Sequence, residues 1–372
     1  MRPSAVSDPA LRAGTVLDID LAAIVENWRS LASRVRPAQC AAVVKADAYG
    51  LGAAPVALAL ARAGCALFFV ATAEEGIALR AALPEASEIA VLNGPPRGCA
   101  AEVAEHRLIP VLNDPGQIAE WAELGAERGG FPAMLHIDTG MARLGLSERQ
   151  LAELEVAATA PPCWRAVLSH LGCADTPAHP LNRVQHARFT AALTRYRGVS
   201  ASFAASSGIF LGPDFHFDLV RPGAALYGVN PQPSGPNPMR PVVRLRARIL
   251  QTRCVDSGES VGYGAAHSVT EPTRIATVAI GYADGWLRSL SQRGCGFIGG
   301  ARVPLIGRVS MDLTVFDVSA IDPAVARPGE FIELLGPGYG VDEAARDAGT
   351  IGYEMLTALG RRHHRIYHEW RA

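Results

Sequence analysis

A lysine, Lys45, lies near the end of the short apolar run Ala41–Ala46. Burying an ammonium group is costly unless the group is paired or its pKa falls. An unpaired lysine amine in a dry pocket is the nucleophile that forms a Schiff base with an aldehyde. A lysine that extends its amine to the rim of the fold would give the same local pattern. Lys45 alone therefore leaves both interpretations open.

A second group of residues could bind a phosphate. The Ser206 hydroxyl and the backbone N–H groups of Gly223 and Ala224 are suitable donors for phosphate oxygens. A serine followed by glycine is commonly only a turn, so this pattern is weak by itself. Combined with Lys45, it suggests a phosphorylated aldehyde cofactor, provided that the fold brings the two groups together.

The elements that would position these residues alternate between apolar runs and alanine-rich stretches. The runs with strand character are Ala41–Ala46, Ala66–Ala71, Ile89–Asn93, Ile109–Asn113, Ala133–Asp138, Ala166–His170, Ala201–Ser206 and Phe217–Arg221. Helices are predicted over Pro55–Arg62, Glu74–Ala82, Pro115–Leu124, Ser147–Ala158 and Leu181–Tyr196. Strand followed by helix, repeated about eight times, is typical of a parallel (β/α)8 barrel of the TIM type.

In such a barrel the reactive groups lie at the C-terminal ends of the strands, and phosphate binds at the loops after strands seven and eight. Lys45 then follows the first strand, and Ser206 and Arg221 end the seventh and eighth. Other polar residues at strand ends or in the loops that follow are His136, Asp138, Arg143, Ser169 and His170. The barrel therefore predicts one mouth that holds the lysine and the phosphate donors together.

Beyond the barrel, the proline-dense segment Asn230–Pro241 is predicted to be a linker. Strands are predicted at Val242–Val255, Arg274–Ile280, Arg302–Ile306, Thr314–Val318 and Phe331–Leu335, with short helices at Glu343–Ala348 and Ile351–Leu359 and an extra strand at Val16–Ile19 ahead of the barrel. We therefore predict an α/β protein with a barrel over residues 14–232 and a second, mostly β domain over residues 233–372.

Composition narrows the class of ligand. The chain has 372 residues, of which 49% are hydrophobic, and a formal net charge of −1 without a basic stripe, so no nucleic-acid partner is expected. Seven cysteines without a C-x-x-C pair indicate reduced thiols and no metal site. No run approaches the ~20 apolar residues of a membrane span. Residues 1–13 lack an apolar core of a signal peptide, so a cytoplasmic location is expected.

Seven motifs together resemble the alanine racemase family. They are Val43-Val44-Lys45-Ala46-Asp47-Ala48-Tyr49-Gly50, Asp138-Thr139-Gly140-Met141-Ala142-Arg143-Leu144-Gly145, Val220-Arg221-Pro222-Gly223, Val261-Gly262-Tyr263-Gly264, Ile280-Gly281-Tyr282-Ala283-Asp284-Gly285-Trp286, Gly307-Arg308-Val309-Ser310-Met311-Asp312 and Gly349-Thr350-Ile351-Gly352-Tyr353-Glu354. They occur in the family's order and cover nearly the whole chain, which makes the resemblance specific.

The resemblance implies a racemase that depends on pyridoxal 5'-phosphate and interconverts L- and D-alanine, supplying D-alanine for peptidoglycan. Lys45 would hold the cofactor as a Schiff base and act as one base. Tyr263 would act as the second base on the opposite face, contributed by the partner subunit of a homodimer. Racemisation needs two such groups, because one removes the Cα proton and the other returns a proton on the other side. A tyrosine with a pKa near ~10 would need nearby positive charge to serve as a base.

The same resemblance implies roles for the remaining motif residues. Arg221 would face the pyridine nitrogen, and because arginine cannot accept that nitrogen's proton, racemisation is favoured over transamination. His170 would pack against the pyridine ring. The phosphate would be bound by Tyr49, Ser206, Gly223, Ala224 and Tyr353. The substrate carboxylate would meet Arg143 and the backbone N–H of Met311, while Tyr282 and Tyr353 would limit the side chain to a methyl group.

The chain departs from the family at three positions. Many members carry a carbamylated lysine two residues before the Asp-Thr-Gly motif, where this chain has His136. A histidine could orient Arg143 only as a neutral acceptor, with an anion such as chloride or Asp138 as other possible partners. The asparagine usual before the phosphate serine is Ala205 here, and the histidine usual after the Tyr-Gly pair is Leu51. These differences bear on substrate range and rate.

Three alternative functions remain open from the sequence. A racemase for serine or for a broader range of amino acids would carry the same motifs. A basic-amino-acid decarboxylase of similar architecture would have a C-terminal cysteine-aspartate pair, and neither Cys254 nor Cys295 lies in such a motif. A non-enzymatic barrel that buffers pyridoxal phosphate would lack the second domain and its tyrosine. The tyrosine motif favours racemisation over the last two.

Overall fold

The computed structural model describes residues 9–157 and 163–369, which form two compact units. The barrel unit comprises Ile24–Arg240, and the C-terminal unit combines the chain from Pro241 onward with the N-terminal segment through Ala23. This division differs from the predicted boundaries, 14–232 and 233–372, mainly at residues 14–23. The physical reason is that strand β1 (Thr15–Asp20) pairs with strands of the C-terminal unit.

The barrel unit is built on one parallel sheet whose described strands follow the order β2-β10-β9-β8-β7-β6-β5-β4-β3. These strands are β2 (Gln39–Cys40), β3 (Ala42–Val43), β4 (Leu67–Val70), β5 (Glu88–Val91), β6 (Ile109–Leu112), β7 (Pro132–His136), β8 (Cys163–Leu168), β9 (Ser200–Ala205) and β10 (Leu219–Arg221). Strands β2 and β3 flank Ala41, and they pair with β10 and β4 respectively. They act as one interrupted strand that closes the barrel, as predicted.

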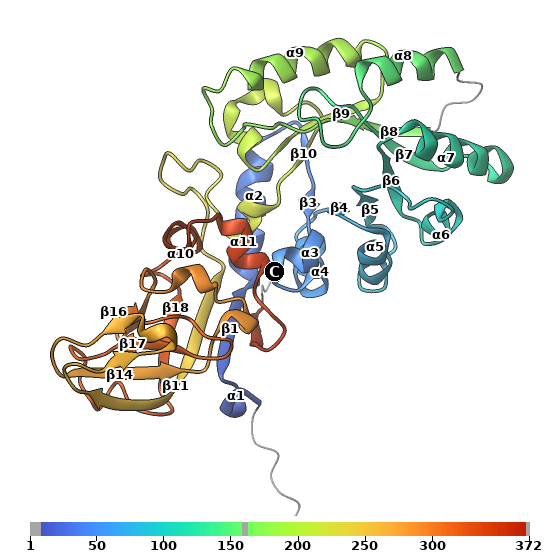
Figure 1. Cartoon of the computed structure of the whole chain (residues 1–372). Coiled ribbons are helices and arrows are strands. Elements are labelled where there is room, and N and C mark those ends of the chain that lie inside the picture. The colour runs from blue at the N-terminus through green and yellow to red at the C-terminus, as the bar shows by residue number, and fades with distance from the viewer. Residues whose placement is uncertain (1–8, 158–162, 370–372) are drawn as a thin grey trace, which may run out of the picture. The chain divides into compact units, whose positions relative to one another are not determined.

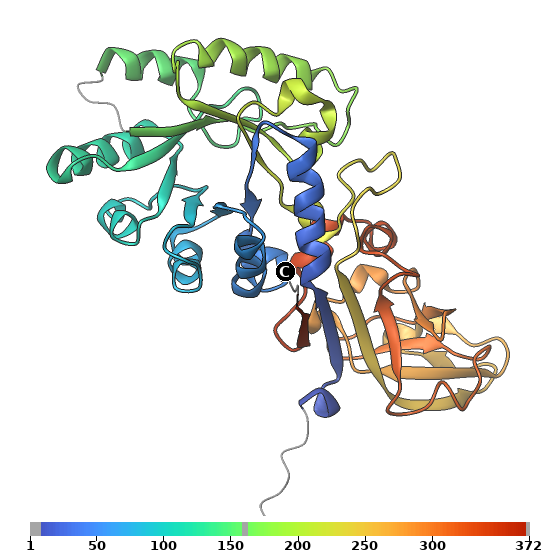
Figure 2. The ribbon, with the colours of Figure 1, turned by 180° about the vertical axis from the view of Figure 1, so that it is seen from behind.

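Helices cover the outer side of these strands (Figures 1 and 2). They are α2 (Leu21–Arg34), α4 (Ala53–Arg62), α5 (Ala73–Arg80), α6 (Ala100–Glu105), α7 (Pro115–Arg128), α8 (Glu148–Ala157) and α9 (Leu181–Leu193). Side-chain caps define two of the starts: Thr72 accepts from the Glu75 N–H before α5, and Asp114 accepts from the Gly116 and Gln117 N–H groups before α7. The predicted helices are confirmed within a few residues, although Ala158 lies outside the described residues, and α2 and α6 were not predicted.

The C-terminal unit holds an eight-stranded sheet in the described chain, with the order β14-β17-β16-β15-β18-β11-β1-β19. Besides β1, the strands are β11 (Val243–Val255), β14 (Thr273–Val278), β15 (Cys295–Ile298), β16 (Ala301–Ile306), β17 (Thr314–Asp317), β18 (Phe331–Leu335) and β19 (His364–His368). The long strand β11 pairs with β1 and β18 through its first half and with β14 through its second half. The sheet therefore bends back on itself, and apolar side chains such as Val255, Ile275 and Ile306 pack together in its core.

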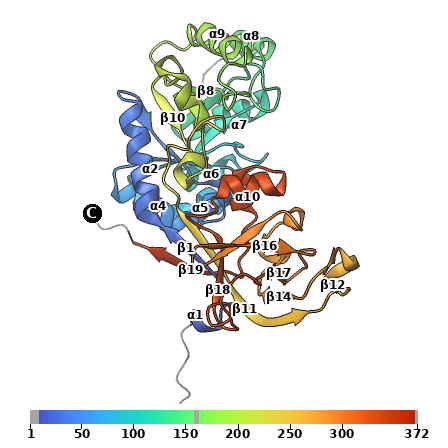
Figure 3. The same cartoon turned by 90° about the vertical axis from the view of Figure 1, so that its left-hand side faces the viewer.

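This unit also has a small hairpin, which carries Tyr263, and two short helices, the second of which carries Tyr353. A hairpin of β12 (Ser260–Val261) and β13 (His267–Ser268) forms its own two-stranded sheet and stands out from the main strands (Figure 3). Helices α10 (Val341–Ala348) and α11 (Gly352–Thr357) agree with the two predicted C-terminal helices.

Residues 9–157 and 163–369 lack two features, a membrane-spanning helix and a cluster of metal-binding side chains. No helix in these ranges is long and apolar enough to cross a bilayer. The same ranges contain no cluster of three or more His, Cys, Asp or Glu side chains that could hold a metal ion.

Candidate active site

Lys45 follows β3 after one residue, Val44, and begins an unusual left-handed turn, α3 (Lys45–Tyr49). The next four residues all have positive φ: 52° at Ala46, 54° at Asp47, 52° at Ala48 and 56° at Tyr49. This conformation costs roughly 1–2 kcal/mol for each residue with a side chain. A run of strained residues persists only where the surrounding structure holds it, and such runs cluster at functional sites.

Glu75 in the first turn of α5 holds this segment in place. One carboxylate oxygen accepts the Ala46 N–H at 2.6 Å, and the other accepts the Ala71 N–H at 2.7 Å. Asp47 adds a third link, because its carboxylate accepts the Ala53 N–H at 2.7 Å. The strained turn after Lys45 is therefore fastened to the next strand and to the following helix.

The environment of Lys45 favours the neutral amine. Burial lowers the pKa of the Lys45 ammonium, the nearby Arg143 guanidinium lowers it further, and Glu75 acts in the opposite direction. A larger fraction of free amine makes Lys45 a better nucleophile toward an aldehyde and a better proton acceptor. The position predicted from a single apolar run thus has the electrostatics that its proposed chemistry requires.

The structure brings Ser206, Gly223 and Tyr49 together on one side of the barrel mouth. The Ser206 Oγ accepts hydrogen bonds from the N–H groups of Gly223 and Ala225, both at 3.1 Å. Both lone pairs are then engaged, and the hydroxyl's own hydrogen is the group left to donate to an anion. Any side chain at 223 would overlap the Tyr49 hydroxyl, since a Cβ there meets Tyr49 Oη.

Tyr49 is fixed from behind by a second tyrosine. Its ring packs on Tyr227 with the centroids 4.8 Å apart. The Tyr227 hydroxyl in turn donates to the Val43 carbonyl at 2.9 Å, within β3. Strand β3, which precedes Lys45, and the loop that carries Gly223 are therefore joined through two aromatic rings. The glycine at 223 is required because it lets the loop approach Tyr49 closely.

Arg221 is a buried cation, 4% exposed, at the end of β10. Its guanidinium donates to the Ser169 carbonyl at 2.6 Å and to the Ser202 hydroxyl. Within the described residues, no carboxylate forms an ion pair with it. Burial lowers the pKa of Arg221 to about 10, so the group stays charged at neutral pH. An arginine that cannot take up a proton thus lies in the barrel interior.

Two histidines near this cation are held neutral. Burial, followed by the charges of Arg221 and Arg143, lowers the pKa of His170 to about 3. Burial and Arg221 likewise lower the pKa of His136 to about 4. Neutral imidazole rings can pack against a flat ring or accept a hydrogen bond, and they add no further positive charge to the site.

Asn113 sets the tautomer of His136. The asparagine amide nitrogen donates to the carbonyls of Leu92 and Val111, so its oxygen is the atom that faces His136 Nδ1, at 2.7 Å. Nδ1 must therefore carry the hydrogen, and Nε2 presents a lone pair. His136 is thus an acceptor, as expected for a residue that could orient a cation.

Asp138 shapes the loop that carries Arg143. Its carboxylate accepts the backbone N–H groups of Gly140, Met141 and Ala142. Burial works to raise the pKa of Asp138, but these hydrogen bonds hold it below the ordinary value. Because these backbone N–H groups occupy the Asp138 carboxylate, Asp138 affects Arg143 by fixing the conformation of the loop that carries it.

The C-terminal unit carries the other predicted residues on three exposed segments. Tyr263 lies between β12 and β13 and is 74% exposed, an unusual state for a large aromatic side chain. Tyr282 lies in a tight turn next to Met311, and both are exposed. Tyr353 is on α11 and is also exposed.

Comparisons with known proteins decide the family. The family model described as alanine racemase, N-terminal domain, matches residues 19–231, and the one described as alanine racemase, C-terminal domain, matches residues 242–367. This chain belongs to the alanine racemase family. The resemblance expected from seven motifs is therefore confirmed.

Individual relatives agree over nearly their whole length. An alanine racemase from Rhodospirillum rubrum is 51% identical over 96% of both proteins. A catabolic alanine racemase from Mesorhizobium japonicum is 47% identical over 95% of this chain and 93% of its own. A crystal structure of alanine racemase from Bartonella henselae with covalently bound pyridoxal phosphate has a TM-score of 0.92 and 43% identity, covering 95% of this chain and 99% of that one.

Sequence reasoning missed three residues that shape this racemase-family site. Asn113 ends the fourth predicted strand, so the same rule that drew attention to His136 could have found it. Glu75 stands three residues after Thr72, a spacing that indicates the start of a helix. This spacing does not reveal that Glu75 contacts the left-handed turn after Lys45. Arg362 lies outside every motif, and nothing in its local sequence indicates its two carboxylate partners.

Proposed function

We propose that this chain interconverts L- and D-alanine with pyridoxal 5'-phosphate, using Lys45 and the partner subunit's Tyr263 as the two bases. The observation that carries the proposal is Lys45 itself, an amine of lowered pKa on a strained turn at the mouth of the barrel. Family membership supports the reaction class, an amino-acid racemisation.

The residues present fit the cofactor. Tyr49, Ser206 and Gly223 form a compact cradle, in which the Ser206 hydroxyl can donate its hydrogen to a phosphate oxygen. Ala224 extends this cradle. Arg221 can donate a hydrogen bond to a pyridine nitrogen but cannot protonate it as a carboxylic acid would. The neutral His170 ring is suited to packing against the pyridine ring. When bound, pyridoxal phosphate supplies an electron-withdrawing ring that weakens the Cα–H bond of an attached amino acid.

The chain's own residues then move one proton on each face. The Lys45 Nζ takes up or returns the Cα proton on one side, and the partner subunit's Tyr263 Oη does so on the other. Arg221 keeps negative charge from settling in the ring, because it cannot deliver an acidic proton to a pyridine nitrogen as a carboxylic acid would. Reprotonation at Cα is thereby favoured, which is racemisation.

Exposure in the C-terminal unit supports the homodimer. Tyr263, Tyr282, Met311 and Tyr353 are all exposed, although large apolar side chains are ordinarily covered in a folded monomer. A second copy that brings its barrel mouth to these residues would bury them and would give each site its second base. In that arrangement Arg143 and the Met311 N–H bind the substrate carboxylate, and Tyr282 and Tyr353 leave room for a methyl group. Pairing of two copies around a two-fold axis supplies two such sites.

We further propose that the protein acts in the cytoplasm and supplies D-alanine for peptidoglycan. Growth of a D-alanine auxotroph that expresses the chain, without added D-alanine, would support this role. A chain that restores racemase activity in extracts but no growth would contradict it.

Circular-dichroism-monitored racemisation of L- and D-alanine tests the chemistry. We expect Lys45→Ala and Tyr263→Phe each to lose at least about 10²-fold in rate, the usual contribution of a positioned base. Lys45→Ala should also lose the visible absorption of the lysine-bound cofactor, whereas Tyr263→Phe should keep it. Full activity of Tyr263→Phe in both directions would rule out the two-base mechanism, and faster turnover of serine than of alanine would favour the alternative substrate.

Mixing the two variants tests whether Tyr263 acts across subunits. Random exchange makes half of the dimers heterodimers, and each heterodimer has one of two sites intact if the tyrosine comes from the partner. Activity should then return to about one quarter of wild type, since one half of one half of the sites is intact. No recovery, with exchange verified by mass spectrometry, would place both bases in one subunit.

A further inference from the structure

Two loops of the C-terminal unit carry the residues that would contact substrate, and they are bonded to each other. The turn Gly281–Gly285 holds Tyr282, and the segment 307–312 holds Met311. The Tyr282 N–H donates to the Ser310 carbonyl and the Ala283 N–H donates to the Met311 carbonyl, each at 3.0 Å. A side chain at Gly281 would overlap the same two carbonyl groups. These two hydrogen bonds align the loops along their backbones.

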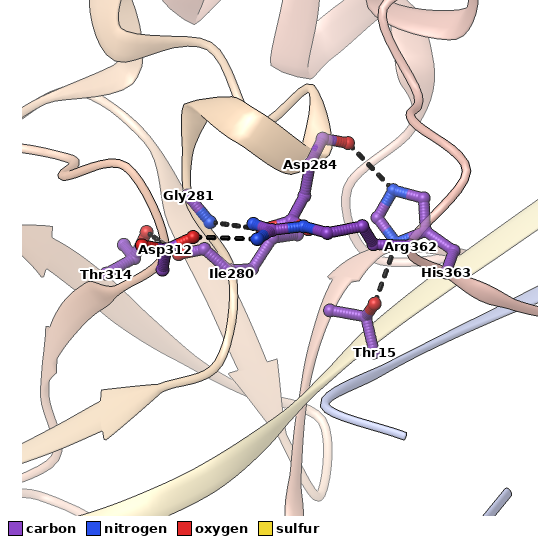
Figure 4. Close-up of polar contacts among 8 residues, drawn as sticks. All are labelled: Thr15, Ile280, Gly281, Asp284, Asp312, Thr314, Arg362 and His363. Atoms are coloured by element: carbon purple, nitrogen blue, oxygen red, sulfur yellow. Dashed lines mark hydrogen bonds and ion pairs between the residues drawn. The ribbon is translucent and has the colours of Figure 1, made fainter. Parts of the chain in front are cut away.

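Arg362 joins these loops a second time, through their carboxylates (Figure 4). Its Nε donates to Asp284 Oδ1 at 2.7 Å, and its Nη1 donates to Asp312 Oδ1 at 2.8 Å. Asp284 follows Tyr282 by two residues, and Asp312 follows Met311 directly. The other Asp284 oxygen accepts the Gly281 N–H at 2.9 Å. One guanidinium thus spans both loops next to their substrate-facing residues.

The Asp284 end of this bridge is rigid. Asp284 is 4% exposed, and its backbone carbonyl accepts from His363 Nε2 at 2.8 Å and from the Gly360 N–H at 3.0 Å. His363 Nδ1 lies 2.8 Å from the Thr15 hydroxyl in β1, so the histidine is held at both ring nitrogens. Figure 4 shows the His363 ring between the Asp284 carbonyl and the Thr15 hydroxyl.

The Asp312 end is different, because the Asp312 side chain is 55% exposed and the Arg362 side chain is 52% exposed. Apart from the backbone contacts between the loops, Arg362 is the side chain that ties the exposed end to the buried one in the described residues. A planar guanidinium with several donors in fixed directions can hold two carboxylates at a set separation, and a lysine cannot.

We propose that Arg362 is a positioning residue that sets substrate specificity, by fixing the separation between the Tyr282 side chain and the Met311 N–H. This inference rests on the proposed function, in which Tyr282 limits the size of the side chain and Met311 binds the carboxylate. Loss of the bridge would let the Met311 loop move relative to the turn, which weakens substrate binding and relaxes the limit on side-chain size. Lys45, at the cofactor, is not part of the bridge.

The test compares Arg362→Met with Arg361→Met. Methionine keeps much of the arginine stem and removes the charge, and Arg361 is the adjacent exposed arginine without an ion pair in the described residues. For Arg362→Met we expect KM for L-alanine to rise about tenfold with kcat within about threefold, the pattern of lost binding. The preference for alanine over serine should fall, and cofactor absorption should be unchanged. Arg361→Met should match wild type in every respect.

Hydrogen exchange provides a readout that does not depend on activity. The N–H groups of Gly281, Tyr282 and Ala283 should exchange faster in Arg362→Met than in Arg361→Met, because the bridge that holds their acceptors is gone. If Arg362→Met does not fold, Asp312→Asn serves instead, since it removes the negative charge at the exposed end of the bridge and so weakens that contact, and changes in the same direction are expected.

The outcomes separate this inference from the proposed function. A wild-type protein that does not racemise alanine would refute the proposed function. Active wild type together with unchanged KM, alanine preference and exchange in both Arg362→Met and Asp312→Asn would overturn the positioning role of Arg362.

Discussion

The left-handed turn after Lys45 predicts that a glycine substitution there stabilises the fold, which is the opposite of the effect of glycine in a regular helix. Glycine in a regular helix costs about 1 kcal/mol relative to alanine. At Ala46, where φ is 52°, glycine removes a left-handed penalty of roughly 1–2 kcal/mol and adds about 0.5–1 kcal/mol of unfolded-state entropy. We therefore expect Ala46→Gly to raise the free energy of unfolding by about 0.5–1 kcal/mol.

The matched control is Ala119→Gly, because Ala119 is equally exposed and lies in the middle of the right-handed helix α7. This variant should lose about 1 kcal/mol, so the two substitutions should differ by roughly 1.5–2 kcal/mol. Urea unfolding of both variants at one protein concentration and one cofactor concentration measures the difference. Equal destabilisation by the two glycines would show that Ala46 carries no left-handed strain, and the account of how Lys45 is positioned would fail.

Two further predictions concern the barrel mouth. Gly223→Ala places a Cβ against the Tyr49 hydroxyl, so we expect a loss of about 1–3 kcal/mol in stability and weaker cofactor retention on dialysis; unchanged retention would contradict the cradle. Burial lowers the pKa of His136 from 6.5 to about 4, so its contribution to stability is complete above pH 6.5 and decreases as pH falls toward 4. Between pH 7 and pH 5, wild type should lose about 2 kcal/mol more unfolding free energy than His136→Asn, and parallel pH profiles would contradict a buried neutral His136.

The barrel could be predicted because each strand is a short apolar run whose period and spacing are local properties. The eight predicted strands are all present, and their ends placed Lys45, Ser206 and Arg221 correctly at the mouth. Strand β1 was predicted as an extra strand ahead of the barrel, but its pairing with β11 in the C-terminal unit joins residues more than 220 positions apart, and nothing local encodes such a partner. The left-handed turn was also beyond reach, since Ala46 and Ala48 are good formers of right-handed helix.

Residues that hold the site were harder to predict than residues that would act in it. Lys45 and Tyr263 stand in motifs, and the chemistry proposed for each demands one residue type. Glu75 and Arg362 act through hydrogen bonds to backbone groups or carboxylates that only the folded chain brings near, so their local sequence looks like ordinary charged surface. Contacts of this kind depend on tertiary structure and leave no spacing pattern in the sequence.

The charges of the barrel mouth serve two purposes at once. Arg143 and Arg221 place positive charge in one region, and burial together with this charge keeps His136 and His170 neutral. An excess of positive charge attracts the anionic groups that the proposed reaction requires, a phosphate and a carboxylate. Burial, and after it the charge of Arg143, lowers the pKa of Lys45, which favours the free amine. A carboxylate in place of Arg221 would reduce the positive charge that attracts anions, so an arginine at the end of β10 suits anion binding.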